Sequence, residues 1–241
     1  MRKKLCILLS ILTAGLLPGC HSGIEPDLSG YASGPAQIPV EILGELDGET
    51  RQALTGEPKY IALTFDDGPH PVYTPMLLEG LKKRGVKVTF FLMGSAVEKY
   101  PDIVKQIADD GHLIGNHTFH HVGLENADTA LIESEVVSAN ELIEKIAGER
   151  PQFIRPPFGQ CDDGIESDTG MICVLWSIDP QDWCTKDASK VVKRVMANAK
   201  DNGIILLHDQ YKTSVMAAFT IIDELQKEGY EFVTVDEILL D

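Results

Sequence analysis

The chain has 241 residues, and 44% of them are hydrophobic, which is enough for one sizeable folded domain. It carries 37 acidic and 21 basic side chains, and the formal net charge of −16 argues against a nucleic-acid partner, since phosphates would be repelled. The charge favours solubility but does not distinguish a glycan from another neutral partner.

The first nineteen residues are typical of an export signal. Three basic residues at 2–4 precede the apolar run 5–17, which is too short to cross a membrane comfortably. A glycine directly before Cys20 resembles the processing box of bacterial lipoproteins, although Pro18 is unusual there. This resemblance implies that Cys20 is acylated and holds the protein on the outer face of the cell membrane. The alternative is a secreted protein that is cleaved nearby.

Residues 20–58 are expected to form a flexible tether, because they hold glycine, proline, serine and scattered acids with one short apolar run. The folded domain is predicted at 59–241. It contains Cys161, Cys173 and Cys184, an odd number for a disulfide framework, and no Cys-x-x-Cys pair that would favour a cysteine zinc site. One bridge with a free thiol and a fully reduced set both remain open.

From Lys59 onward, short apolar strands alternate with amphipathic helices, which predicts parallel β-α units. Strands are predicted at 60–65, 86–92, 113–115, 152–154, 172–178, 203–207 and 231–235, and helices at 74–84, 101–110, 129–147, 188–199 and 215–228. The stretch 160–171 is polar and broken by glycine, so we expect a short or irregular crossover there. The pattern predicts an α/β fold, a distorted (β/α) barrel with about seven parallel strands.

Side chains that can do chemistry follow the predicted strands at five places. These are Asp66 and Asp67 after the first strand, His117 and His121 after the third, Arg155 after the fourth, Asp179 and Asp182 after the fifth, and His208 after the sixth. Placing two carboxylates side by side costs free energy unless a cation lies near both of them, because each negative charge raises the pKa of the other group. Each place alone has an ordinary explanation as a turn or loop. Together they predict one site, since the carboxyl ends of barrel strands share a face.

These residues lie in five segments that resemble, in the same order, the motifs of the polysaccharide deacetylases, carbohydrate esterase family four. The segments are Thr-Phe-Asp-Asp-Gly-Pro at 64–69, His-Thr-Phe-His-His at 117–121, Arg-Pro-Pro-Phe-Gly at 155–159, Asp-Pro-Gln-Asp-Trp at 179–183 and Leu-Leu-His at 206–208. The resemblance covers residues 59 to about 240. It implies that 59–241 is a catalytic domain that hydrolyses acetyl groups on a polysaccharide.

The resemblance implies a divalent metal held by Asp67, His117 and His121. The two histidines would share one face if their segment is helical, because they are four residues apart. One carboxylate and two imidazoles suit zinc, which we expect, and also cobalt or nickel. Such a metal lowers the pKa of bound water and polarises a carbonyl. His120 and His70 are interpreted as surface or supporting residues rather than ligands.

The other motif residues resemble the acid and base machinery of the family. Asp66 is expected to act as general base, with Arg155 holding its carboxylate through a planar fork. His208 is expected to act as general acid, oriented by Asp182. Phe158, Trp183 and Leu206 are expected to line the substrate groove, and the backbone N–H of Phe158 to help bind the oxyanion. Family members often have tyrosine at the position of Phe158.

The prediction is therefore a metal-dependent deacetylase that acts outside the cytoplasm on N-acetylated sugars, above all N-acetylglucosamine of peptidoglycan. One alternative is an O-acetyl esterase that acts on xylan or a similar polymer. Another is a non-catalytic module that binds wall glycan. Such a module would be expected to lack a metal-ligating residue, the general base or the general acid. A nucleotide-binding α/β enzyme is disfavoured, because no glycine-rich loop follows the first strand. We expect the protein to be a monomer whose partner is the polysaccharide substrate. We expect it to contact the membrane only through a lipid anchor at Cys20.

Overall fold

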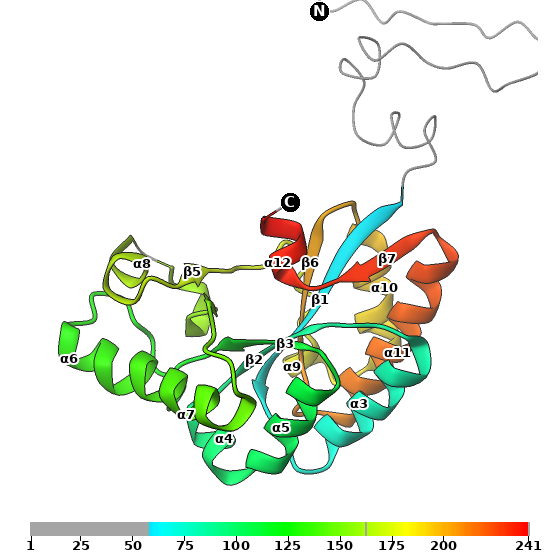
Figure 1. Cartoon of the computed structure of the whole chain (residues 1–241). Helices are drawn as coiled ribbons and strands as arrows, with labels where there is room; N and C mark the ends of the chain where they lie inside the picture. Colours follow the sequence, from blue (N-terminus) through cyan, green and yellow to red (C-terminus); the bar gives the residue numbers. More distant parts are fainter. Residues whose placement is uncertain (1–57, 162, 241) are drawn as a thin grey trace, which may run out of the picture. The chain divides into compact units, whose positions relative to one another are not determined.

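The computed structural model describes residues 58–161 and 163–240, so Cys20, the predicted signal and nearly all of the predicted tether lie outside it. Within these residues there are seven strands: β1 (Lys59–Gly68), β2 (Thr89–Leu92), β3 (Leu113–Asn116), β4 (Phe153–Ile154), β5 (Ile172–Cys173), β6 (Gly203–His208) and β7 (Tyr230–Val233). All pair in parallel in the order β5-β4-β3-β2-β1-β6, with β7 beside the first half of β1. The sheet curls into a half-barrel with helices around it (Figure 1), which confirms the predicted α/β fold.

Helices connect the strands and cover the sheet. They are α3 (Tyr73–Arg84), α4 (Gly94–Lys99), α5 (Pro101–Asp109), α6 (Thr129–Ile132), α7 (Ser138–Ala147), α8 (Asp163–Thr169), α9 (Asp182–Thr185), α10 (Ala188–Asn198), α11 (Lys212–Lys227) and α12 (Val235–Leu239). A π-helical segment, η1 (Glu133–Val137), separates α6 from α7, and a 3₁₀ turn, η2 (Pro157–Gly159), follows β4. None of the helices in the described part of the chain is both long enough and apolar enough to span a membrane.

The predicted strand at 172–178 is wrong over most of its length. Only Ile172 and Cys173 belong to β5, and the chain then meets β6 at a single bridge between Ile178 and Ile205. The reason lies in a distant side chain, because the carbonyls of residues 174 and 175 accept hydrogen bonds from Arg155 rather than from a strand. The buried guanidinium of Arg155 therefore takes the place of part of the strand-to-strand hydrogen bonding between β5 and β6.

The predicted last strand at 231–235 also ends too late. Thr234 is the N-cap of α12, where its side chain and that of Glu237 form a capping box. The backbone N–H of Val235 donates to Thr89 Oγ1 on β2, so this residue starts a helix instead of pairing with β1. A capping box satisfies two free backbone donors locally, which explains why the strand stops at Val233.

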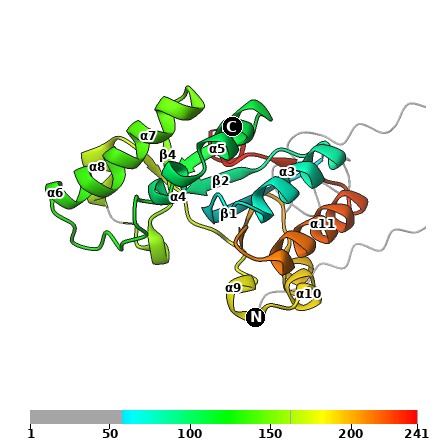
Figure 2. The ribbon, with the colours of Figure 1, turned by 90° about the horizontal axis from the view of Figure 1, so that it is seen from below.

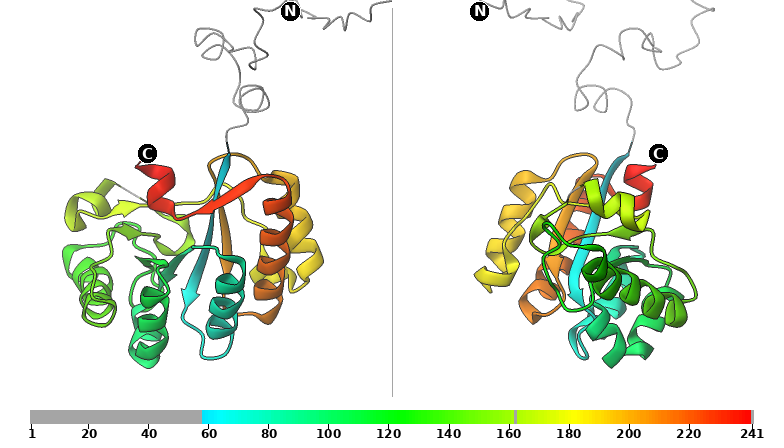
Figure 3. Two further views of the ribbon diagram at one scale, coloured as in Figure 1. Left: turned by 45° about the vertical axis from the view of Figure 1, so that its right-hand side comes forward. Right: turned by 90° about the vertical axis from the view of Figure 1, so that its left-hand side faces the viewer.

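The carboxyl ends of the strands form one face of the domain. Helices α3, α10 and α11 pack side by side along one flank, while α5 packs with α7 on the other (Figures 1 and 3). Strand β1 runs downward in Figure 1, so the view from below in Figure 2 faces the strand ends. The core part of β1, from Ile61 to Phe65, is completely buried. The residues that follow Phe65 are therefore held on a rigid support.

The crossover at 160–171 contains only the seven-residue helix α8, in agreement with the predicted short connection. A disulfide joins Cys161 to Cys173, while Cys184 is free and exposed, so among the domain cysteines the arrangement is one bridge with one thiol. The bridge ties the segment after η2 to β5, across 12 residues of sequence.

Replacing Cys161 and Cys173 together with serine is expected to lower the free energy of unfolding by about 3 kcal/mol, because a short cross-linked loop restricts the unfolded chain. Denaturant titrations of the wild type, with and without reductant, and of the double variant would measure this. Cys184→Ser is the matched control and should leave the midpoint unchanged, since this thiol has no disulfide partner. Equal midpoints for the oxidised and reduced wild type would contradict the prediction.

Candidate active site

Strand pairing brings the predicted base and acid next to each other. Asp66 on β1 lies directly opposite His208 on β6 in the parallel register. On the other side, the N–H of His117 donates to the carbonyl of Leu92, and that of Arg155 to the carbonyl of Asn116. The pairing of neighbouring strands thus continues into the segments that carry the motifs. Figure 2 looks onto this edge of the sheet.

Asp67, His117 and His121 bring three donor atoms to within 4.8 Å of one another. Asp67 Oδ1 lies 3.3 Å from Nε2 of each histidine, and it is a buried oxygen without a hydrogen-bond partner in the described chain. Nδ1 of His117 lies 2.6 Å from the carbonyl oxygen of Arg155, to which it donates, so that its Nε2 presents a lone pair. Burial by itself would raise the pKa of Asp67, but the interactions with His117 and the other nearby histidines lower it. An unpartnered anionic oxygen between two imidazole nitrogens fits a divalent cation.

The segment that carries the two histidines is not helical, so their four-residue spacing does not place them on one face of a helix. Residues 117–121 form an irregular loop in which Thr118 and His121 have positive φ angles of 62° and 61°. These left-handed residues fold the loop back so that the two rings are 5.0 Å apart. His120 points away from the three donors to Glu135, 2.9 Å from its Oε1, as expected of a supporting residue.

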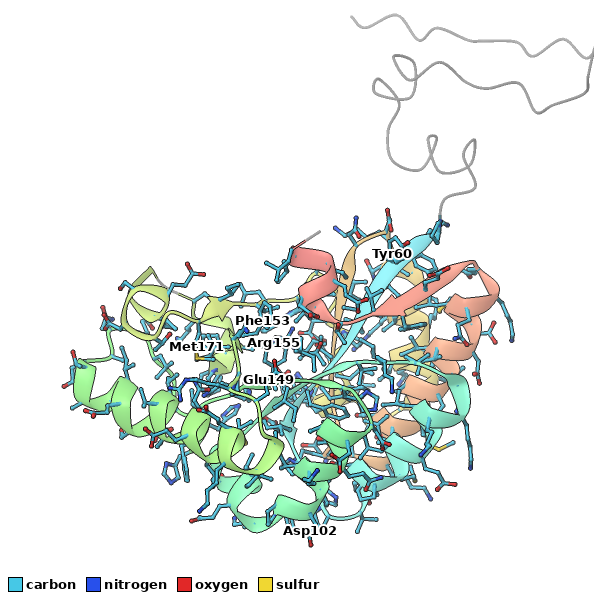
Figure 4. The ribbon with its side chains drawn as sticks, in the orientation of Figure 1. Tyr60, Asp102, Glu149, Phe153, Arg155 and Met171 are labelled. Carbon is cyan, nitrogen blue, oxygen red and sulfur yellow. A yellow bond between two sulfur atoms is a disulfide. The ribbon has the colours of Figure 1, made fainter. Side chains whose placement is uncertain are left out.

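Arg155 is completely buried and pairs with Asp66. Its Nη1 lies 2.8 Å from Asp66 Oδ1 and 2.7 Å from Thr64 Oγ1, while Nε and Nη2 donate to two backbone carbonyls. The predicted planar fork on the carboxylate is therefore replaced by a single contact. Figure 4 shows Arg155 in the middle of the domain, close to Phe153 of β4. The guanidinium also stacks 4.1 Å from the ring centre of Phe91, and the other oxygen of Asp66 lies 3.9 Å from His117 Nε2.

Asp182 holds His208 through two contacts. Its Oδ2 accepts from the backbone N–H of His208 at 2.8 Å, and its Oδ1 lies 2.9 Å from the ring Nδ1. Burial alone would lower the pKa of His208, but the hydrogen bond and charge of Asp182, with the charges of Asp66 and Asp67, raise it to about 9. Asp179, by contrast, is exposed and accepts from the N–H of Gln181 within its own turn.

The three predicted groove residues occupy different environments. Phe158 is 71% exposed, and its ring meets the edge of His121 with centres 5.1 Å apart. Trp183 is 51% exposed in α9, next to Asp182. Leu206 is buried in β6, two residues before His208 and thus on the same side of the strand. Phe158 and Trp183 therefore stand at the surface, Phe158 against His121 and Trp183 next in sequence to Asp182.

A cleft of about 590 Å³ opens from the metal donors toward α4 and the loop after β6. Its lining residues are Asp67, Pro69, His70, Pro71, Met93, Ser95, Ala96, Lys99, Tyr100, His121, Gln210 and Tyr211. A second cavity, of about 390 Å³, lies at the amino ends of β3 and β4 around His112 and contains none of the motif residues. The pKa of His112 is lowered to about 4 by burial, and its Nδ1 accepts from the N–H of Val88. The second cavity is thus separate from the proposed chemistry.

Several contacts behind the motif residues could not be read from sequence. Asp209 is completely buried, it accepts from Thr74 Oγ1, and burial raises its pKa to about 7. A Cβ atom at Gly68 would lie 2.7 Å from Asp209 Oδ2, so a larger residue at this bend would displace the Asp209 carboxylate. Gln210 donates from Nε2 to the carbonyl of Asp67, whose φ of 71° is left-handed. No local pattern marks these roles, because they depend on β1 and β6 lying side by side.

Comparisons with known proteins agree with this arrangement. The family model described as polysaccharide deacetylase matches residues 53–171. The peptidoglycan-N-acetylmuramic acid deacetylase PdaC of Bacillus subtilis (strain 168) is 41% identical over 180 residues, 75% of this chain and 38% of that protein. A peptidoglycan-N-acetylglucosamine deacetylase of Bacillus cereus (strain ATCC 14579) is 40% identical over 189 residues, 75% of this chain and 88% of that protein.

A solved structure of a family 4 acetyl xylan esterase from Clostridium thermocellum, in complex with a cobalt ion, has a TM-score of 0.71 at 34% identity. The match covers 76% of this chain and 91% of that one. The chain spans only 38–39% of the length of the longer curated relatives. The shared fold, the identity to relatives over most of the chain and the motif residues at one sheet edge together show that the protein belongs to the polysaccharide deacetylase family.

Proposed function

We propose that the protein is a metal-dependent hydrolase that removes acetyl groups from N-acetylated sugars of an extracytoplasmic polysaccharide, above all N-acetylglucosamine of peptidoglycan. The observation that carries this proposal is the convergence of three metal donors, a buried carboxylate-arginine pair and an aspartate-histidine pair at one sheet edge. The names of the bacterial relatives support peptidoglycan as the substrate class.

Asp67, His117 and His121 would hold the cation, with zinc as the first choice and cobalt or nickel as alternatives. When bound, such a cation lowers the pKa of water and polarises the acetyl carbonyl. The proton transfers use side chains of the protein itself. Asp66 takes a proton from the attacking water through Oδ2, the oxygen that Arg155 does not hold. Arg155 fixes this carboxylate in place through its contact with Oδ1.

His208 completes the reaction. As the water oxygen bonds to the acetyl carbon and the carbon–nitrogen bond breaks, Nε2 of His208 donates a proton to the leaving nitrogen, which gives acetate and a free amine. Asp182 holds the opposite ring nitrogen and so orients the donor. Phe158, Trp183 and Leu206 would line the groove that receives the sugar and the acetyl methyl. The backbone N–H of Phe158 would add a donor for the oxyanion.

The second candidate is an O-acetyl esterase, favoured by the similarity to an acetyl xylan esterase. The same base, cation and oxyanion donors serve an ester, whose alcohol leaves more easily than an amine. A non-catalytic glycan-binding module is disfavoured, because the described residues include all three metal donors, the base and the acid.

A substrate panel tests the proposal. The apo protein, prepared with a chelator and reloaded with zinc, cobalt or nickel, would be assayed for acetate release from peptidoglycan, N-acetylglucosamine oligomers and acetylxylan. We expect release only after metal is restored, with wall glycan turned over best. Turnover of acetylxylan alone would establish the esterase, and absence of release from every substrate with every metal would overturn the hydrolase.

We further propose that residues 1–19 are a lipoprotein signal, that 20–58 are a tether, and that a lipid on Cys20 holds a monomeric catalytic domain (59–241) at the outer face of the cell membrane. The apolar run and the glycine before Cys20 support this proposal. Cys20→Ser should move the protein from the membrane fraction to the medium or the soluble fraction. Retention of the variant in the membrane fraction would contradict the anchor.

A further inference from the structure

We infer that the cleft beside the metal donors is a subsite for a carboxylate carried by the glycan, and that Lys99 is its recognition residue. This inference rests on the proposed function, because it concerns the substrate of the same site. It would make the preferred substrate an acidic N-acetylated glycan rather than a neutral one.

The cleft is continuous with the reaction site. Asp67 and His121 are part of its lining, and the cleft extends between the loop after β1, the helix α4 and the loop after β6. Tyr100 and Tyr211 are half-buried in its lining, and such rings can pack against a sugar face. A polymer whose acetyl group lies at the cluster of Asp67, His117 and His121 would therefore place a neighbouring sugar in this cleft.

The charge of the cleft differs from that of the chain as a whole. Asp67 is the only carboxylate in its lining, and Lys99 is the only lysine or arginine, although acidic residues outnumber basic ones by 37 to 21 in the sequence. Lys99 is exposed at the end of α4 and makes no ion pair or hydrogen bond within the described residues. A second amine, Lys186, lies 5.7 Å from the ring centre of Tyr211. Away from the metal donors, the cleft therefore favours an anion.

A carboxylate distinguishes the candidate polymers. Chains of N-acetylglucosamine and of acetylated xylose carry no charge, whereas every second sugar of peptidoglycan bears a lactyl carboxyl group, either free or extended by an acidic peptide. Both forms offer a carboxylate next to an N-acetyl sugar. An unpaired ammonium group beside the reaction site can bind either form.

The test compares Lys99→Met with Lys193→Met, which removes the same charge from an exposed position on α10 outside the cleft. Four oligosaccharides of equal length would be used: a neutral N-acetylglucosamine oligomer, a peptide-free peptidoglycan glycan, the same glycan with its carboxyls converted to methylamides, and a peptide-bearing glycan. Lys99→Met should raise KM about fivefold for substrates with a carboxylate, because an exposed ion pair contributes about 1 kcal/mol at most. The effect should shrink in high salt.

The outcomes separate this inference from the proposed function. A KM increase confined to the peptide-free acid would identify the lactyl carboxylate, and one confined to the peptide-bearing glycan would identify the peptide. An unchanged KM, or an equal increase for the neutral oligomer and for Lys193→Met, would overturn the subsite while the hydrolase stands. Failure of the wild type to release acetate from any substrate would overturn the hydrolase itself.

A different set of contacts carries a second inference: the structure assigns Glu135 as a positioning residue for the metal-binding loop. Its carboxylate is buried in the π-helical segment η1. Oε2 accepts from the backbone N–H groups of Phe119 and His120 at 3.0 and 2.8 Å, and Oε1 contacts His120 Nδ1. π-helical turns often occur where a side chain serves a functional site.

These contacts act on the part of the loop that lies between His117 and His121. The two left-handed residues, Thr118 and His121, flank the backbone groups that Glu135 holds. Asn116 supports the same loop by accepting from the N–H of Thr118 at 2.7 Å. Without Glu135, two backbone donors would lose their partner and His121 its fixed place opposite Asp67. Supporting contacts of this kind are worth about 10–100-fold in metal affinity.

The test measures zinc affinity of the apo protein by competition with a chromophoric chelator. Glu135→Ala should weaken binding about tenfold or more, while Glu135→Gln, which can still accept both N–H bonds, should stay close to the wild type. His120→Ala, which removes only the side-chain contact, should also bind zinc well. If Glu135→Ala does not fold, Glu135→Asp, whose carboxylate is one methylene shorter, should show the loss. A lower melting temperature with unchanged zinc affinity would reduce Glu135 to a purely structural role.

Discussion

Asp66→Asn is expected to reduce kcat for acetate release by about 10³-fold, because an amide cannot accept the proton that the base must remove from water. Zinc affinity should change little, since the three candidate donors are Asp67, His117 and His121. KM should also stay near the wild-type value. Acetate release, measured with metal at saturation, separates this loss from a binding defect.

The same substitution has a cost in stability. Arg155 is completely buried, and Asp66 is its only carboxylate partner in the described structure. Loss of that charge leaves a buried cation uncompensated, which we expect to lower the free energy of unfolding by about 3 kcal/mol. The measured kcat must therefore be normalised by the fraction of folded protein, which denaturant unfolding gives. Asp66→Asn that is folded and keeps more than about a tenth of wild-type kcat would exclude Asp66 as the base.

Asp179→Asn is the matched control for this experiment. Asp179 belongs to the same set of strand-end acids, but it is exposed and its oxygen accepts only from Gln181. An asparagine can keep that bond. The control should therefore retain nearly full activity and stability, and a large loss would show that any acid removed from this edge impairs the protein.

Asp182→Asn is expected to move the alkaline limb of the pH profile of kcat/KM. The general acid must be protonated, and the pKa of His208 is raised above the ordinary value of 6.5, to about 9 when no cation is bound, so wild-type activity should decline only at alkaline pH. A cation on Asp67 would offset the contributions of the two adjacent acids, which leaves Asp182 as the main cause. In the variant, burial still lowers the pKa, so the limb should fall to or below the ordinary value of 6.5.

At pH 8 the variant should lose about 10²-fold or more in kcat/KM, because most of its His208 is deprotonated and the ring is free to turn. The measurement is the pH profile of both proteins, together with an NMR titration of the ring. A variant whose alkaline limb coincides with that of the wild type would show that Asp182 does not set the pKa of His208.

Stability should follow the same linkage. The folded pKa of His208 lies above its unfolded value of 6.5, so its charged form contributes stability that is fully present below pH 6.5 and is lost as pH rises through about 9. Unfolding free energies measured across this range should decline in the wild type. Asp182→Asn should lack this decline, because the interaction that favours the charged ring is gone.

Much of the fold could be predicted from local patterns. The strand before Asp66 and the strand before His208 are continuous apolar runs that are buried in the structure, and a parallel arrangement places their ends on one face. The positions of the motif residues follow from this. It explains why the cluster of Asp67, His117 and His121, the pair of Asp66 with Arg155 and the pair of Asp182 with His208 lie at one edge of the sheet. Short elements such as α4 and α9 were missed, since six and four residues hold too little periodicity.

By itself, the sequence determined the strand segments, the motifs at their carboxyl ends and the chemical types of these residues, because apolar runs, helical periodicity and the alternation of strands with helices are local patterns along the chain. Tertiary structure alone decided that 117–121 is a loop held by Glu135, that Arg155 takes the carbonyls of the expected strand, and that Lys99 borders the cleft. Each of these contacts joins residues that are at least 15 positions apart along the chain or borders a space enclosed by several elements. Such contacts depend on how whole elements pack, and no local pattern of residues records that packing.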